Sequence, residues 1–501
     1  MRSQLPAVAI SVLLSACGGG GGANSASALP AVNAGGGSPS ASSSPRASTS
    51  PRASATPNAT PTPVFTPAAG TAPAHIATWA FDESSAEGAG APVALVQQYL
   101  TYAQGGYGDA KARSDCDGAG PSSCSSVFYF DPNFIYDAPS CTPQIASLFM
   151  AAADETWFVH ETGYSDAAHR VTGSYQESCN GTTITVPVYL TNQSNASVDA
   201  FFSNYIQTYA SGWDRYFMDD TSASVLTQTY GPGGGFCADN PPDDYCTTTQ
   251  EYPTDASVVA AHAALTSVLN QTSGSAMLGM FNGVGFSGNT PENLNLIPAS
   301  NGRLLGAVCE NCVVNAGTLE SANYQRVLNA MATTNATAGA SFVELNTGSS
   351  PAGSAAQISQ RLVTTAIAWL GFNGNATVVF ANLEENSSDL AIWPEAGLYP
   401  TQPVQSMNSG ASDISVTSNV WRREFGACYL NGSAIGPCAA LLNATSSPVP
   451  ITSSWLTQSY GHVVSIAGGD IESGGSVSLT AATFSSATTT IPASGAVLLV
   501  R

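Results

Sequence analysis

The sequence predicts an α/β protein with a (β/α)8 TIM barrel and a small C-terminal antiparallel β-sandwich domain. From His75 onward, short continuous apolar runs alternate with helical patterns, which is typical of parallel strands that are buried on both faces. About eight such units follow one another, and eight is the number that closes a barrel of this kind. After Ser412 the apolar runs become short and are separated by Gly, Asn and Pro turns, which favours antiparallel strands.

Each expected barrel strand is a short apolar run that ends near a polar side chain. An open doubly wound sheet is the alternative, but the glycine run at 231–235 lies in a cysteine-flanked loop and does not open a helix as a phosphate turn would. The third strand is either 157–159 or 184–190. The other strands are expected at 76–81, 127–130, 216–218, 276–281, 304–309, 340–343 and 377–381, and helices at 93–104, 143–153, 198–210, 256–269, 322–332 and 358–370.

Composition divides the chain into a signal segment (1–17), a linker (18–73), the barrel (74–411) and the β domain (412–501). The linker consists mostly of Gly, Ser, Ala, Thr and Pro, so it has too little apolar surface to offset the entropy lost on ordering. We expect it to be a disordered spacer.

The N-terminus has the pattern of a bacterial lipoprotein signal. Arg2 precedes an apolar stretch from Leu5 to Leu14, and small residues then lead to Cys17. The stretch is too short to remain as a membrane-spanning helix. We expect lipidation of Cys17 and an extracytoplasmic protein anchored to the outer membrane or the cell surface. An ordinary secretory signal with a chance cysteine is the alternative.

The formal net charge of −21, with only 13 basic residues, argues against a nucleic-acid partner. An uncharged polar surface suits a carbohydrate partner, and we expect a monomer. Eleven cysteines minus Cys17 leave ten, which an oxidising compartment would pair as disulfides. A zinc site is the weaker interpretation because the chain has a single CxxC, and we expect no metal and no cofactor. Local spacing suggests the pairs Cys116–Cys124, Cys141–Cys179, Cys237–Cys246, Cys309–Cys312 and Cys428–Cys438.

Polar residues gather where the expected strands end, which is where barrel proteins carry their working residues. Any one of them could be a helix cap or a loop charge. Several acidic strand ends together favour a functional cleft, because an unpaired buried carboxylate is costly. These residues are Asp82, Asp131, His160, Asp219, Asp220, Glu310, Glu344 and Glu384.

The segment 213–221 (WDRYFMDDT) resembles the fourth strand of the barrel glycoside hydrolases that include α-galactosidases and α-amylases. The segments 157–161 and 421–425 also resemble parts of these families. In them, the Asp that closes the fourth strand is commonly the nucleophile, and the resemblance implies Asp219 for that role. Arg215 and Tyr216 depart from the usual Gly and aliphatic residues, so the match is partial.

Glycosidic cleavage needs one carboxylate that attacks or activates water and a second that protonates the leaving oxygen. We expect Asp219 as nucleophile or base and Glu310 as general acid, with Asp220 and Glu344 as the respective alternatives. The residues expected to bind sugar are Asp82, Asp131, His160, Asn346, Glu384 and Trp79.

Tyr129 and Trp393 are further candidates for stacking on sugar rings, although core packing also explains each aromatic side chain. His262 is expected to be a core or surface residue. A Ser-His-Asp hydrolase is disfavoured because no Gly-x-Ser-x-Gly elbow lies between a strand and a helix. A non-catalytic carbohydrate-binding lipoprotein and a surface adhesin remain the alternative functions.

Overall fold

A computed structural model describes most of the chain beyond residue 76. The described residues are 77–80, 102–105, 107, 113, 124–137, 144–179, 182–219, 221, 249–272, 278–282, 286–287, 290–291, 304–310, 312–315, 317–335, 341–347, 350–351, 353–372, 378–383, 393–469 and 474–501. The predicted signal segment, Cys17 and the linker lie outside these residues and stay predictions. Among the helices that are described, none is both long and apolar enough to cross a membrane.

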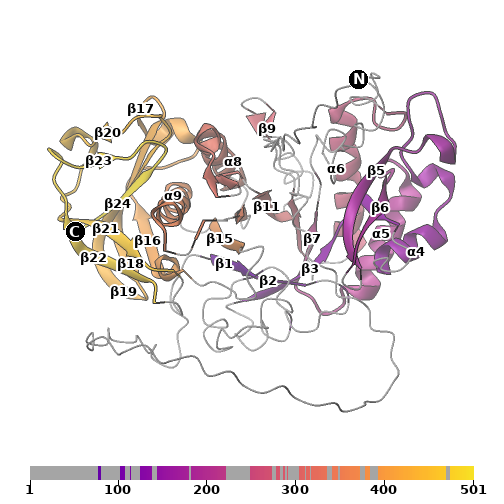
Figure 1. The fold of residues 1–501 in the computed structure, drawn as a ribbon, viewed down its shortest axis with the longest axis horizontal. Helices are drawn as coiled ribbons and strands as arrows, with labels where there is room; N and C mark the ends of the chain where they lie inside the picture. Colours follow the sequence, from indigo (N-terminus) through magenta and orange to yellow (C-terminus); the bar gives the residue numbers. More distant parts are fainter. Residues whose placement is uncertain are drawn as a thin grey trace, which may run out of the picture.

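Eight parallel strands close into a barrel at the centre of the molecule (Figure 1). Each strand pairs in parallel with both of its neighbours, and the last strand, β15, closes the ring against β1. In ring order they are β1 (Ala77–Ala80), β2 (Tyr102–Gly105), β3 (Ser125–Phe130), β7 (Arg215–Met218), β8 (Leu278–Asn282), β11 (Leu304–Glu310), β14 (Ser341–Thr347) and β15 (Val378–Leu383).

Four connections between barrel strands contain described helices, close to their predicted positions. Helix α5 (Ala196–Tyr209) precedes β7, α6 (Asp255–Thr272) precedes β8, α8 (Tyr324–Asn335) precedes β14 and α9 (Ala355–Gly371) precedes β15. Asn195 and Ser354 cap α5 and α9 by accepting backbone N–H groups with their side chains, as helix N-termini require.

The structure corrects the prediction for the second barrel strand. Residues 102–104 were expected to end a helix, but they form β2, which pairs with both β1 and β3. Neither 157–159 nor 184–190, the two alternatives for the third strand, belongs to the barrel. Residues 184–190 alternate between buried and more exposed side chains, which is typical of an antiparallel strand with one covered face rather than of a barrel strand.

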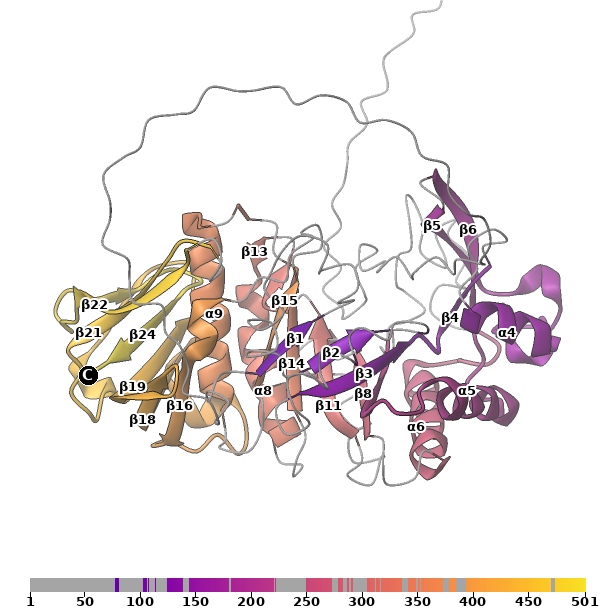
Figure 2. The ribbon, with the colours of Figure 1, turned by 90° about the horizontal axis from the view of Figure 1, so that it is seen from below.

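An insert between β3 and β7 carries a small antiparallel sheet of order β4-β6-β5 and packs beside α5 (Figure 2). Phe158 makes an isolated bridge to Thr191 next to this sheet. The insert consists of β4 (Phe134–Tyr136), α4 (Gln144–Ala152), the 3₁₀ turns η1 (Glu155–Trp157) and η2 (Ala167–His169), β5 (Thr172–Cys179) and β6 (Thr182–Leu190).

The C-terminal β domain contains one seven-stranded antiparallel sheet and a separate two-stranded sheet, rather than two sheets of similar size. The large sheet already includes β16, before the expected boundary at 412. Its strands are β16 (Leu398–Pro403), β17 (Ser415–Thr417), β18 (Val420–Leu430), β19 (Ser433–Asn443), β21 (His462–Ala467), β22 (Ser476–Thr483) and β24 (Ala496–Val500); β20 (Val449–Pro450) pairs with β23 (Thr490–Ile491). Two short hairpins lie outside this domain, in connections between barrel strands. They are β9 (Phe286–Ser287) with β10 (Thr290–Pro291), and β12 (Val314–Asn315) with β13 (Thr318–Leu319).

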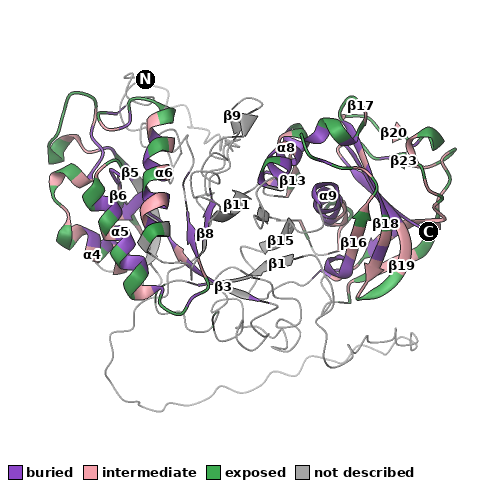
Figure 3. Cartoon of the chain, turned by 180° about the vertical axis from the view of Figure 1, so that it is seen from behind, coloured by how far each residue is buried: buried purple, intermediate pink, exposed green. Residues whose placement is uncertain are grey.

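Helix α9 joins the barrel to this sheet and is buried on most of its surface (Figure 3). Arg361 on α9 binds Glu395 through two hydrogen bonds of 2.6 Å and also donates to the carbonyl of Gly468 at 2.7 Å. From the sheet, Arg423 donates to the carbonyls of Leu370 and Phe372 at the end of α9. These contacts bind the two parts into one folded unit.

The disulfide Cys428–Cys438 confirms one predicted pair, which links β18 to β19. Cys124 and Cys312 are also disulfide-bonded. The other cysteines expected in disulfides are outside the described residues or lie on strands where only the backbone is described.

Candidate active site

Alternation along the strands decides which residues line the inside of the barrel. Phe128 and Phe130 face outward, where they pack on Tyr205 and Phe202 of α5. Tyr129 lies between them in sequence and therefore faces the interior.

The same alternation operates in β7. Tyr216 and Met218 belong to the core outside the barrel, whereas Phe217 pairs with Tyr129 in register and lies 6.0 Å from its ring. Asp219 follows by two residues, so it stands on the inner side of the carboxyl end of β7, the fourth strand of the ring.

The carboxylate of Asp219 is buried and accepts hydrogen bonds from two neighbouring strands. The Tyr129 hydroxyl of β3 donates to Oδ2 at 2.8 Å, and Nδ2 of Asn282, the last residue of β8, donates to Oδ1 at 2.8 Å. These two hydrogen bonds fix the orientation of the carboxyl group at the mouth of the barrel.

Asp131 has a structural role. It follows β3 at the same rim, and its Oδ1 accepts the backbone N–H groups of Asn133 at 2.8 Å and Phe134 at 3.1 Å. Oδ1 thus shapes the turn that leads from the barrel into the insert, in agreement with the loop-cap interpretation, and the contact of Asp131 with a sugar stays a prediction.

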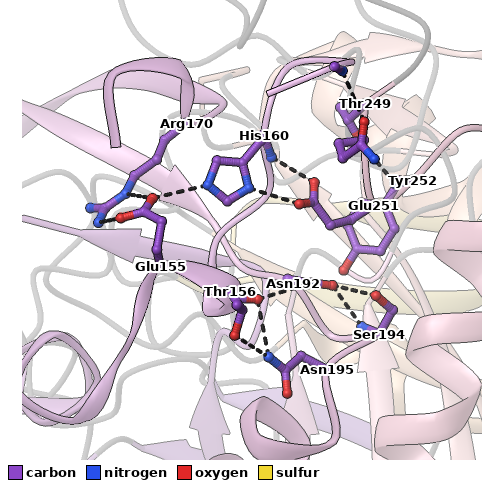
Figure 4. Close-up of polar contacts among 12 residues, drawn as sticks. Glu155, Thr156, His160, Arg170, Asn192, Ser194, Asn195, Thr249, Glu251 and Tyr252 are labelled. Atoms are coloured by element: carbon purple, nitrogen blue, oxygen red, sulfur yellow. Dashed lines mark hydrogen bonds and ion pairs between the residues drawn. The ribbon is translucent and has the colours of Figure 1, made fainter. Parts of the chain in front are cut away.

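His160, expected to bind sugar, is instead the centre of a charged cluster in the insert (Figure 4). Its Nδ1 lies 2.8 Å from Glu251 and its Nε2 lies 3.0 Å from Glu155, while Arg170 binds Glu155 through Nε and Nη2 at 2.7 and 2.6 Å. Both ring nitrogens thus lie within hydrogen-bond distance of carboxylate oxygens. With 1% of its surface exposed, His160 has no nitrogen left for a ligand.

Within this cluster, the hydrogen bonds from Arg170 lower the pKa of Glu155 from 4.5 to about 2, although partial burial opposes the change. The main chain of His160 also contacts the segment before α6, because its N–H donates to Glu251 at 2.7 Å and its carbonyl accepts from Gln250 at 2.9 Å. The cluster therefore ties the insert to the connection between β7 and α6.

Glu310 and Glu344 lie on neighbouring strands but differ in position along them. Glu310 ends β11, as predicted. Glu344 was expected to end its strand, but β14 continues for three more residues to Thr347. Asn346 lies near this strand end, paired with Asn382, and Trp79 lies in β1, paired with Ala381.

Three predicted site residues, Asp82, Asp220 and Glu384, fall outside the described residues. Trp393, a candidate for stacking on sugar, is buried against α9, where the guanidinium of Arg361 lies 4.4 Å from its ring centroid. Core packing therefore accounts for this tryptophan.

No protein-family model matches the chain, and no curated protein matches it. Solved structures similar to it include the glycoside hydrolase domain of PelA from Pseudomonas aeruginosa, with 11% identity over 64% of this chain and 97% of that one and a TM-score of 0.35. The α-glucosyl transfer enzyme XgtA has 10% identity over 78% and 84% with a TM-score of 0.36. The α-galactosidase TtGalA from Thermus thermophilus has 15% identity over 64% and 63% with a TM-score of 0.35. TM-scores this low establish neither a common fold nor a common activity.

For three residues of the site, the sequence had suggested either no role or a different role. Tyr129 was expected to stack on sugar. No role was assigned to Asn282, which follows the strand expected at 276–281, or to Asn133, whose Nδ2 donates to the backbone carbonyl of Asp219 at 3.3 Å. Asn282 could have been found by the rule that led to Asp219, because it also follows a buried apolar run. Asn133 and the hydroxyl of Tyr129 leave no comparable signal in the sequence.

Proposed function

We propose that this protein is an exported glycoside hydrolase that acts on an oligo- or polysaccharide, with Asp219 as nucleophile or base. The observation that carries the proposal is the buried Asp219 carboxylate, fixed by Tyr129 and Asn282 on the inner side of the fourth strand of a parallel barrel. An oriented carboxylate at this rim is suited to attack an anomeric carbon or to take a proton from water. The Cys428–Cys438 disulfide supports an oxidising compartment.

Glu310 is our choice for the general acid. Val308 of β11 pairs with Asn282, the asparagine that contacts Asp219. Glu310 lies two residues after Val308, so its position falls on the same face of the sheet as that of Asn282. Glu344 pairs with Cys309, so its position falls on the opposite face of the sheet. The register therefore favours Glu310 over Glu344 as the partner of Asp219.

The span between β7 and β11 suits a pair of catalytic carboxyl groups. Only β8 separates the two strands, and neighbouring strands lie about 4.8 Å apart. Two side chains on backbones about 10 Å apart reach the roughly 5–10 Å carboxyl separation that glycosidic cleavage uses. In the proposed reaction the glycosidic C–O bond breaks and Glu310 gives its proton to the leaving oxygen. Either Asp219 bonds to the anomeric carbon, and water deprotonated by Glu310 then hydrolyses this ester, or Asp219 deprotonates the water that attacks directly.

The variant Asp219→Asn tests the proposal. The new amide has the same shape, its oxygen accepts from Asn282 and its nitrogen donates to the Tyr129 oxygen, so we expect an almost unchanged melting temperature. Hydrolysis, measured as release of reducing ends from a panel of polysaccharides, should fall at least roughly 10³-fold.

Asp214→Asn is the matched control. Asp214 precedes the same strand at the opposite end of the barrel, where it accepts from the N–H and the hydroxyl of Ser126 at 2.8 and 2.9 Å. This variant should keep its hydrolytic rate even if it melts earlier. Full activity in Asp219→Asn would overturn the assignment, and sugar binding without hydrolysis by the unmodified protein would favour a non-catalytic carbohydrate-binding role.

A further inference from the structure

Asn133 connects the candidate nucleophile to helix α6. The side chain is 1% exposed, and its Oδ1 accepts from Nε2 of Gln193 at 2.6 Å and lies 2.9 Å from Nε2 of His262. Its Nδ2 donates to the backbone carbonyl of Asp219 at 3.3 Å. Three segments that are distant in sequence thus meet at one amide group directly behind the catalytic rim.

The directions of these hydrogen bonds are determined by a carbonyl group that can only accept. Nε2 of Gln193 also donates to the carbonyl of Pro132 at 3.1 Å, which fixes which end of the Gln193 amide is the nitrogen. That nitrogen then requires the oxygen of Asn133, and the amide nitrogen of Asn133 must face Asp219. His262 must therefore present a protonated Nε2 to Asn133.

His262 is neutral when it makes this contact. Burial lowers the pKa of His262 to about 4. A neutral imidazole has one N–H group, and Asn133 uses it. The contact therefore persists over the neutral pH range without placing a second charge near Asp219.

We propose that His262 and Asn133 are positioning residues for Asp219. His262 holds the Asn133 amide, and Asn133 holds the main-chain carbonyl of Asp219, so the direction in which the Asp219 side chain leaves the backbone is set from behind. Tyr129 and Asn282 then fix the carboxylate from the front. The expected effect of the two residues on the hydrolytic rate rests on the proposed function, whereas their expected effect on the backbone of Asp219 does not.

The test compares two substitutions of His262 in the full-length protein. His262→Gln places an amide nitrogen where Nε2 stood, so the donor to Asn133 is kept, and kcat should stay within about threefold of its original value. His262→Leu removes the donor. Because small misplacements of a reacting group reduce rates strongly, kcat should fall on the order of tenfold to a hundredfold while KM changes little.

A second variant keeps the inference testable if His262→Leu does not fold. Asn133→Asp has the same shape and still accepts from Gln193 and His262, but it has no donor for the Asp219 carbonyl, so kcat should fall as in His262→Leu. Thr266→Val is the control, because Thr266 lies one turn further along α6, is fully buried and should leave kcat unchanged.

Hydrogen–deuterium exchange in the peptide 215–221 separates this inference from the proposed function. Exchange there should increase in Asn133→Asp and His262→Leu but not in His262→Gln or Thr266→Val. If the unmodified protein hydrolyses no glycan, the enzymatic proposal fails, and the exchange pattern still decides whether the pair fixes the backbone. Equal kcat and equal exchange in all four variants would overturn the positioning role.

Discussion

At the scale of single residues, the site depends on partners that are far from Asp219 in sequence. The Tyr129 hydroxyl comes from 90 residues upstream and the Asn282 amide from 63 residues downstream. The sequence predicted Asp219 because it closes an apolar run, which is a local signal. It could not predict which neighbours would donate to the carboxylate, because the ring order of the strands decides that.

Removal of the Tyr129 hydroxyl should weaken the site without destroying it. In Tyr129→Phe the Asp219 carboxylate loses a donor, which makes its charged form less favoured. We expect kcat/KM to fall roughly tenfold to a hundredfold, since a hydrogen bond to a charged group contributes about 1.5–3 kcal/mol, and the acidic limb of the pH–rate profile to move to higher pH. Tyr205→Phe, on the outer side of the barrel, should leave the profile unchanged; an unchanged profile in Tyr129→Phe would contradict the assigned role.

At the scale of elements, the sequence predicted long apolar strands and amphipathic helices well and short strands poorly. β2 was missed because Tyr102-Ala103-Gln104-Gly105 has only two apolar residues and continues an apparently helical pattern. The run before His160 was mistaken for a barrel strand because a short aromatic run fits either a strand or a core turn. Glu344 was placed at a strand end because its charge was taken to stop the strand, but β14 continues to pair with β11 to Leu345 and with β15 to Thr347.

The cluster around His160 should make the insert sensitive to acid. The folded-state pKa of Glu155 is lowered from 4.5 to about 2, so its stabilising contribution is complete above pH 4.5 and is lost as the pH falls towards 2. Glu155→Gln should therefore show a smaller loss of stability between pH 4.5 and 2 than the unmodified protein, as measured by urea unfolding at several pH values. Glu161→Gln, next to the same histidine in sequence, is the control. A parallel decline in Glu155→Gln and the unmodified protein would exclude this origin of acid sensitivity.

At the scale of the whole molecule, the barrel and the C-terminal sheet share helix α9. Val363 and Leu370 of α9 belong to the same hydrophobic core as Leu498 and Val500 of β24, and the Arg361–Glu395 pair is almost completely buried, at 4% and 0% exposure. The sequence showed a change of pattern near residue 412. It did not show that the change marks a junction within one core, because long-range packing has no local signature.

Disruption of the Arg361–Glu395 pair should destabilise both parts together. Arg361→Met leaves the carboxylate of Glu395 buried without its partner, and we expect a loss of about 3–5 kcal/mol in the free energy of unfolding. The double variant Arg361→Met/Glu395→Leu should recover most of that loss, because no buried charge remains. Denaturant unfolding followed by tryptophan fluorescence and circular dichroism should give coincident transitions. Two separate transitions would show that the parts fold independently.

The distance along the chain between α9 and the strand that covers it also bears on when the protein can fold during its synthesis. Gly371 ends α9, and β24 begins only at Ala496. Until β24 has left the ribosome, the apolar side of α9 lacks one of its covering strands, although all eight barrel strands precede β24 in the chain. The packing of α9 is therefore completed only when the last strand arrives, and until then its uncovered apolar side is prone to aggregation.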